Sequence, residues 1–252
     1  MANPSQASAT SSAERCTRRA VRVPLAAALL ALLAVPFAVT MLLVQGRWAP
    51  LLGADQGARD GLHSYALRHA GFVAAMQVIS ALGSGVAWVV VLTPVVAWLL
   101  WRGLPRLALF VAVTALGSSL LNVVVKTAVH RLRPVLPDPV ARAQGLSFPS
   151  AHAQGAVVGA ALLLLVFLPV LSSAWRKGAV IFGAVAVGAI GFSRVALGVH
   201  YLSDVLGGYF LGAAWVAAMV GVFNALALHQ QRRGALTSGR SPGKPFGGTP
   251  GR

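Results

Sequence analysis

The residues Val23–Val44, VPLAAALLALLAVPFAVTMLLV, form an apolar run without a single charged side chain. A helix that crosses the hydrocarbon core of a bilayer needs about 20 predominantly apolar residues. The run reaches that length, whereas the apolar region of a cleaved signal peptide usually has about 7–15 residues. The stretch therefore predicts a membrane-spanning helix with a kink at Pro36, and a cleaved signal peptide is the alternative.

The composition of the whole chain is that of a membrane protein. Of its 252 residues, 57% are hydrophobic and only 10% are charged, whereas a typical soluble domain has about 25% charged residues. Five acidic residues and one cysteine, Cys16, are too few for some classes of site. A two-metal hydrolase needs a cluster of carboxylate and histidine ligands, and a thiolate zinc site or a disulfide needs at least two cysteines.

Further apolar runs predict an all-α fold, a bundle of six transmembrane helices. The expected spans are residues 23–44, 86–101, 104–125, 153–171, 178–196 and 205–228. Apolar residues at near-helical spacing over residues 62–82, together with His63, Arg68 and His69, predict an additional interfacial helix on the outer face. We expect a disordered basic tail at 1–22, a transmembrane domain at 23–229 and a second disordered basic tail at 230–252.

The distribution of basic residues predicts the orientation of the bundle. Thirteen of the 21 Lys and Arg residues lie in the two tails and in the loops at 102–106 and 176–177. By the positive-inside rule, both termini are then cytoplasmic and the protein is a multi-pass protein of the plasma membrane, which in a bacterium is the inner membrane. The loop at 126–152 and the segment 196–204 are expected to face outward. The basic residues cluster in loops and form no stripe, which argues against nucleic-acid binding.

Glycines four residues apart occur in two of the predicted spans. The pairs are Gly155 with Gly159 and Gly208 with Gly212. Such spacing allows helices to approach closely, but the high frequency of glycine in this chain explains the pairs equally well. The oligomeric state is not determined by these features.

Ionisable residues gather on the side that is predicted to face outward. They are Lys126, His130, Arg131, Arg133, His152, Arg194, His200 and Asp204. An ionisable group at membrane depth costs roughly 2.5 to 3.5 kcal/mol on insertion scales, so a cluster of them indicates a functional site. Cations and histidines with almost no competing acid suit a phosphoryl group, because Arg, Lys and amide donors stabilise its charge in the transition state.

Two local patterns within this cluster have both a catalytic and a structural interpretation. His200 and Asp204 are four residues apart, so on a helix they share a face as an imidazole–carboxylate pair; alternatively, Asp204 is only a favourable acid at a helix start. Ser150 precedes an apolar run and is a good N-cap, and the free amides after it would bind an anion or simply be capped.

Three spaced motifs resemble the signatures of the type 2 phosphatidic acid phosphatase superfamily. Residues 126–134, KTAVHRLRP, resemble its K-x6-R-P signature; residues 149–152, PSAH, resemble P-S-G-H; and residues 193–204, SRVALGVHYLSD, resemble S-R-x5-H-x3-D. All three occur in the order found in the family, and the resemblance covers roughly residues 20–228. Ala151 stands where the family usually has glycine, and an alanine keeps the backbone N–H.

The resemblance implies a role for each matching residue. His200 would attack phosphorus to form a phosphohistidine, Asp204 would hold its ring, and His152 would protonate the leaving group and then activate water. Phosphate would be held by Lys126, Arg133, Arg194, Ser150 and the Ala151 amide, without a metal or other cofactor. Outside the matched positions, we consider Arg131 as an additional phosphate contact, interpret His130 as a loop histidine, and expect Asp204 to be the one carboxylate of the site.

These features predict an integral-membrane phosphatase acting on a lipid phosphate or diphosphate. Polyprenyl diphosphates such as undecaprenyl diphosphate, phosphatidic acid and phosphatidylglycerophosphate are the candidate substrates, and an outward site favours the prenyl carrier. The alternatives are a protein that binds or transports a lipid phosphate without cleaving it, and a vanadium-dependent haloperoxidase. Six spans count against the haloperoxidase, whose known forms are soluble, and the two histidines with Asp204 count against mere binding.

Overall fold

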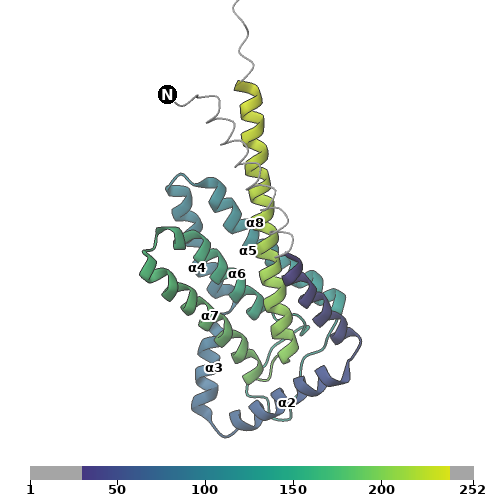
Figure 1. Cartoon of the computed structure of the whole chain (residues 1–252). Helices are drawn as coiled ribbons and strands as arrows, with labels where there is room; N and C mark the ends of the chain where they lie inside the picture. Colours follow the sequence, from purple (N-terminus) through teal and green to yellow (C-terminus); the bar gives the residue numbers. More distant parts are fainter. Residues whose placement is uncertain (1–29, 239–252) are drawn as a thin grey trace, which may run out of the picture.

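The computed structural model describes residues 30–238, and this part of the chain is helical without strands (Figure 1). The helix Leu30–Gln45 comes first. It is followed by α2 (Ala49–Ala66), α3 (Ala70–Leu82), α4 (Gly85–Trp101), α5 (Pro105–Val129), α6 (Ala151–Phe167), the short 3₁₀ helix η1 (Leu168–Val170), α7 (Ser173–Ala196) and α8 (Leu202–Ser238). The predicted tail at 1–22 and the beginning of the first predicted span lie outside the described residues.

The described helices have the lengths and composition of a multi-pass membrane protein. Four segments are long and apolar enough to cross a membrane by themselves: α5, α6 with η1, α7, and α8 as far as Ala227. Two further crossings depend on bent pairs. Leu30–Gln45 meets α2 at 90°, and α3 meets α4 at 42°, so the described residues provide four to six spans. Six, the predicted number, is the upper limit.

The single helix expected over residues 62–82 is absent, because α2 ends within this range and α3 begins anew. The amides just after α2 bond to the carbonyl three residues back, with Arg68 N–H donating to Tyr65 O and His69 N–H donating to Ala66 O. The imidazole Nδ1 of His69 lies 2.8 Å from Tyr65 O and the backbone of His69 is non-helical, so this residue closes α2 and opens α3. The prediction of one helix was wrong because apolar periodicity does not register such a break.

The C-terminal helix is longer than expected. The sequence predicts a tail from residue 230, but α8 continues to Ser238. In Figure 1 it is the long helix that rises beyond the other labelled helices, while α2 lies across the opposite end of the bundle. Residues 239–252, the rest of the predicted tail, lie outside the described residues.

Two helix ends set the position of the polar residues. α5 runs to Val129, four residues beyond the predicted end of the span, so that Lys126 lies in its last turn. His130 ends this helix in the left-handed conformation, with φ of 52°. α6 starts after Ser150, whose hydroxyl accepts from the amide of Ala153 at 3.5 Å. The loop between the two helices carries Arg131 and Arg133.

Glycines on α8 allow its first turns to lie directly against the start of α6. A methyl group added to Gly208 would lie 2.6 Å from Ser150 O, and one added to Gly212 would lie 2.9 Å from Gln154 O. The pair at 208 and 212 therefore has the close-packing role that its spacing allows. This packing lets Ser150 N–H donate to Asp204 O at 2.9 Å, which joins the beginnings of the two helices.

The apolar core lies between α4, α5, α6 and α8. Its buried members include Leu99, Val111 and Leu162, each with 0% of its surface exposed. α6 is the central helix, since it packs against α4, α5, α7 and α8. The core fixes the helices along their length and leaves the polar loops at one end to form the site.

Candidate active site

His200 and Asp204 form the centre of the polar cluster. His200 lies between α7 and α8, and Asp204 lies in the first turn of α8. The imidazole Nδ1 of His200 is 3.3 Å from Oδ2 of Asp204. That same oxygen also accepts from the hydroxyl of Ser147 and, at 2.9 Å, from the amide of Tyr201. Three donors therefore fix the carboxylate against the imidazole.

Arg133 identifies the protonation state of the His200 ring. Its Nη1 lies 2.9 Å from Nε2 of His200. A guanidinium can only donate, so Nε2 must accept and carry a lone pair. The ring proton is then on Nδ1, from which it is donated to Asp204. The nitrogen with the lone pair faces a cation, which is the arrangement that a nucleophile for an anionic substrate requires.

The surroundings of His200 keep its imidazole neutral. Burial lowers its pKa to about 4, and the cations Arg133 and Arg194 act in the same direction, while Asp204 opposes them. The ring is therefore uncharged at neutral pH. A neutral imidazole has the lone pair that nucleophilic attack needs.

Lys126 and Arg133 donate to backbone carbonyls around the site. The ammonium of Lys126 donates to Leu146 O at 2.6 Å and to Ser147 O at 3.2 Å. The guanidinium of Arg133 donates through Nε to Gln144 O, at 3.1 Å, and through Nη1 to Val199 O, at 2.8 Å. These carbonyl bonds orient both cations, and in the described part of the chain neither forms an ion pair with a carboxylate.

Arg194, near the end of α7, is the third cation of the site. It is buried, with 8% of its surface exposed, and Nη1 donates to the hydroxyl of Ser80 on α3. Its Nε has no protein partner within the described residues. Arg194 therefore keeps a donor for a ligand, and α3 helps to position it.

The start of α6 contributes His152, Ser150 and Ala151 to the same region. His152 is half-buried and lies within electrostatic range of Lys126, Arg133, Arg194 and His200. Ser150 is fully buried and its hydroxyl is the N-cap, so the capping interpretation describes its contact here. Ala151 is exposed at the first turn, where helix amides are free to bind an anion.

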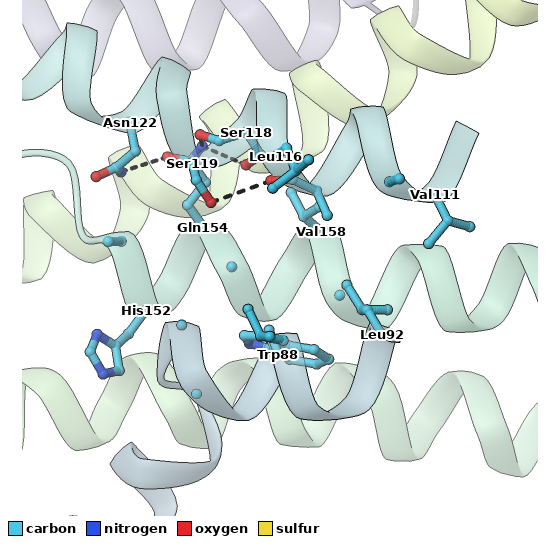
Figure 2. A pocket seen from close by; sticks show the side chains of 18 of the residues that line it. Trp88, Leu92, Val111, Leu116, Ser118, Ser119, Asn122, His152, Gln154 and Val158 are labelled. Atoms are coloured by element: carbon cyan, nitrogen blue, oxygen red, sulfur yellow. Dashed lines mark hydrogen bonds between the residues drawn. The ribbon is translucent and has the colours of Figure 1, made fainter. Parts of the chain in front are cut away.

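A largely apolar groove of about 580 Å³ extends from this site along α4, α5 and α6. Figure 2 shows His152 at one end, and Val111 and Leu92 toward the other. Val89 and Leu116, which also line the groove, are exposed at the surface of the bundle. The groove thus connects the polar site to the apolar surface of the spans.

A buried amide cluster forms one wall of the groove (Figure 2). Asn122 donates to Gln154 Oε1 at 2.7 Å, and Gln154 donates to the hydroxyl and the carbonyl of Ser118 at 2.8 and 2.9 Å. These bonds satisfy polar groups at membrane depth and tie α5 to α6. The cluster was not anticipated from the sequence.

The structure adds residues that the sequence interpretation missed. Arg131, considered as a phosphate contact, donates instead through Nη1 to Asp204 Oδ1 and through Nη2 to Asp55 Oδ2, each at 2.7 Å. Asp55, on α2, is 1% exposed and binds Ser203 as well. The expectation that Asp204 is the one carboxylate of the site is therefore wrong. The rarity of acids in the chain was the only signal that could have pointed to Asp55.

The remaining predicted residues converge as the motifs suggested. Lys126, Arg133, His152, Arg194, His200 and Asp204 come from α5, the loop that follows it, α6, the end of α7 and the start of α8, and they meet at one end of the bundle. His130 ends α5 and has no side-chain contact among the described hydrogen bonds. Its interpretation as a loop histidine is consistent with that position.

The fold and the site define a class of membrane protein in which a histidine lies beside several cations at the ends of the helices. Here the cations are Lys126, Arg133 and Arg194, which together are called the cation cage. Residues 106–227 match the family model of the PAP2 superfamily. This segment contains all three motifs, and the match confirms the resemblance to this superfamily drawn from the sequence.

Two matches, one to a curated sequence and one to a solved structure, come from Bacillus subtilis. Phosphatidylglycerophosphatase B of strain 168 is 40% identical over 116 residues, which make up 44% of this chain and 53% of that protein. The chain thus aligns with about half the length of this curated relative. The crystal structure of a transmembrane PAP2 type phosphatidylglycerolphosphate phosphatase matches with a TM-score of 0.68 and 26% identity, covering 78% of this chain and 96% of the other.

Proposed function

We propose that the protein is a membrane phosphatase that hydrolyses a lipid phosphate monoester or diphosphate through a phosphohistidine intermediate. The observation that carries this proposal is the pairing of charges around His200. The ion pairs found among residues 30–238 involve neither Lys126, Arg133 nor Arg194. Three cations without a carboxylate partner next to an unprotonated imidazole nitrogen suit a phosphoryl group.

The proposed reaction proceeds in two displacements. Nε2 of His200 attacks phosphorus, a nitrogen–phosphorus bond forms, and the bond from phosphorus to the leaving oxygen breaks while His152 donates a proton to that oxygen. Water then attacks the phosphohistidine, His152 accepts a proton from the water, and phosphate leaves with Nε2 unprotonated again. Arg133, which contacts Nε2 of His200, would turn to the incoming phosphate.

The cations of this chain are proposed to do the work that a metal ion does in other phosphatases. Lys126, Arg133 and Arg194 would bind the non-bridging oxygens, with the amides at the start of α6. Among residues 30–238, no group of three or more His, Cys, Asp or Glu side chains could hold a metal ion. We therefore expect turnover that does not depend on a divalent cation.

The groove supports a lipid as the substrate. It begins at His152 and has apolar walls from α4, α5 and α6, so an acyl or prenyl chain could remain at membrane depth while its phosphate enters the cage. The names of both relatives make phosphatidylglycerophosphate the first substrate to test. The distribution of basic residues supports cytoplasmic termini and an outward site, which also makes a polyprenyl diphosphate a candidate.

Phosphate release by the purified protein tests this proposal. The substrates would be phosphatidylglycerophosphate, phosphatidic acid and undecaprenyl diphosphate in detergent, each with and without EDTA. We expect release from at least one lipid and the same rate in the chelator. Binding of these lipids without release would show a lipid-phosphate binding protein instead, and loss of the activity in EDTA would refute the metal-independent mechanism.

Filling the groove should impair lipid substrates selectively. Ala115 lines the groove, and Ala115→Phe would occupy part of it. Each methylene kept out of an apolar site forfeits about 0.8 kcal/mol, so exclusion of two should raise KM for a lipid roughly tenfold. Hydrolysis of the soluble ester para-nitrophenyl phosphate, measured in parallel, should change little.

The matched control is Val113→Phe on the same helix. Val113 is exposed and does not line the groove, so this variant should behave as the wild-type protein with both substrates. An equal loss of activity toward lipid and soluble ester in Ala115→Phe would contradict the assignment of the groove to the lipid chain.

A further inference from the structure

The two oxygens of the Asp204 carboxylate have different partners. Oδ2 faces the imidazole of His200, while Oδ1 accepts a hydrogen bond from Nη1 of Arg131 at 2.7 Å. The orientation of the carboxylate, and the share of its charge that reaches His200, therefore depend on Arg131.

Arg131 is held in place by a second carboxylate, Asp55. Nη2 donates to Asp55 Oδ2 at 2.7 Å, and Nη1 also donates to the hydroxyl of Ser203 at 2.7 Å. The guanidinium carbon lies 4.2 Å from the centre of the Tyr201 ring, at a distance typical of a cation–π contact. The side chain of Arg131 is only 11% exposed. These contacts go to Asp55, Ser203, Asp204 and Tyr201, and none of them involves a cation proposed to bind phosphate.

Asp55 belongs to a part of the chain that none of the three motifs includes. It lies on α2, and its carboxylate also accepts from the amide of Ser203 at 2.8 Å and from the hydroxyl of the same residue at 2.5 Å. Ser203 and Asp204 are neighbours at the start of α8. α2 is thus fastened to the helix start that carries Asp204.

We propose that Asp55 is a positioning residue for the reaction, which acts through Arg131 on Asp204 and so on the nucleophile His200. This inference rests on the proposed phosphatase function. Asp55 and Asp204 share the guanidinium of Arg131, so these three side chains together carry one net negative charge. That charge can stabilise the imidazole of His200. Without Asp55, the guanidinium would pair with Asp204 alone and neutralise its negative charge. The imidazole of His200, which becomes positive during attack, would then lose that stabilisation.

The charge argument predicts a specific kinetic signature for Asp55→Asn. Loss of a hydrogen bond to a charged group should lower kcat roughly 10- to 100-fold. KM and inhibition by inorganic phosphate should stay within about a factor of two or become slightly tighter, because removal of a negative charge does not weaken a cation cage. A role of Arg131 as a direct phosphate contact predicts a different result, in which phosphate inhibition weakens together with kcat because Arg131 loses its support.

The test compares the purified full-length variants for kcat, KM, phosphate inhibition and thermal unfolding in detergent. Asp60→Asn is the matched control, since Asp60 is on the same helix with a 58% exposed side chain and, among the described residues, forms an ion pair only with its neighbour Arg59. It should keep wild-type kinetics. Asp55→Glu retains the charge and should recover part of the kcat that Asp55→Asn loses.

Two results would overturn the inference while the proposed function stands. One is an unchanged kcat in Asp55→Asn, and the other is a loss of kcat with an equal weakening of phosphate inhibition. If Asp55→Asn does not yield folded protein, Ser203→Ala is judged by the same criteria, because it removes the hydroxyl that joins Asp55 and Arg131. A wild-type protein that releases no phosphate from any lipid would overturn the proposed function, and this inference with it.

Discussion

His200→Ala should abolish phosphate release, with a loss on the order of 10⁴-fold or more, because it removes the atom that attacks phosphorus. The structure makes this expectation specific to one atom. Nε2 accepts a hydrogen bond from Arg133, so it carries the lone pair, and Nδ1 is occupied by its contact with Asp204. His152, the other histidine of the site, is assigned to proton transfer, and the cations alone only bind phosphate.

The measurement is phosphate release under single-turnover and steady-state conditions, with a rapid acid-free quench to detect the phosphoenzyme. The wild-type protein should accumulate a base-stable phosphoenzyme that His200→Ala lacks. His229→Ala is a suitable control, since His229 is an exposed histidine in the last part of α8, away from the site. Near-normal turnover by His200→Ala would show that the nucleophile is assigned wrongly.

Asp204→Asn should lower kcat roughly 10³- to 10⁴-fold, the scale seen when the acid of a histidine–carboxylate pair becomes an amide. An asparagine can turn its NH₂ group toward Nδ1 of His200. The ring proton would then move to Nε2 and block the lone pair needed for attack. Arg131 would also lose one of its two carboxylates, so the loop that carries it would be less firmly held.

KM should change much less than kcat in Asp204→Asn, because Lys126, Arg133 and Arg194 remain in place to bind phosphate. The matched control is Asp138→Asn, which makes the same change at an exposed position of the loop between α5 and α6. Retention of turnover within about a factor of ten would contradict the role assigned to Asp204, since that loss corresponds to only about 1.4 kcal/mol. Thermal unfolding of the purified variant separates this effect from a loss of folded protein.

The spans and the motif residues could be predicted because their signals are local. A run of about 20 apolar residues defines a span by itself, and three short motifs place Lys126, Arg133, His152, Arg194, His200 and Asp204 at the ends of such spans. The predicted helix ends were wrong where the end of a helix depends on a few hydrogen bonds. The break at His69 and the continuation of α8 past residue 230 are not visible in composition or periodicity.

The role of Arg131 could not be predicted because it depends on a partner far along the chain. Arg131 lies two residues before Arg133, and both are arginines in a basic loop. Only the packing of α2 against the start of α8 brings Asp55 to Arg131 and Ser203, across 76 and 148 residues of sequence. A buried carboxylate needs a partner and binds the guanidinium that lies within reach. Arg131 and Arg133 therefore differ in role because only Arg131 lies next to the buried Asp55.

The sequence by itself determined that the chain is an apolar helical membrane protein and which residues of its motifs meet at one end of the bundle, because apolar length and local spacing are properties of the chain. The tertiary structure decided how the charges pair. It assigns Arg131 to two carboxylates and, among residues 30–238, leaves Lys126, Arg133 and Arg194 without one, because the pairing of charges depends on distances between helices that are separate in sequence.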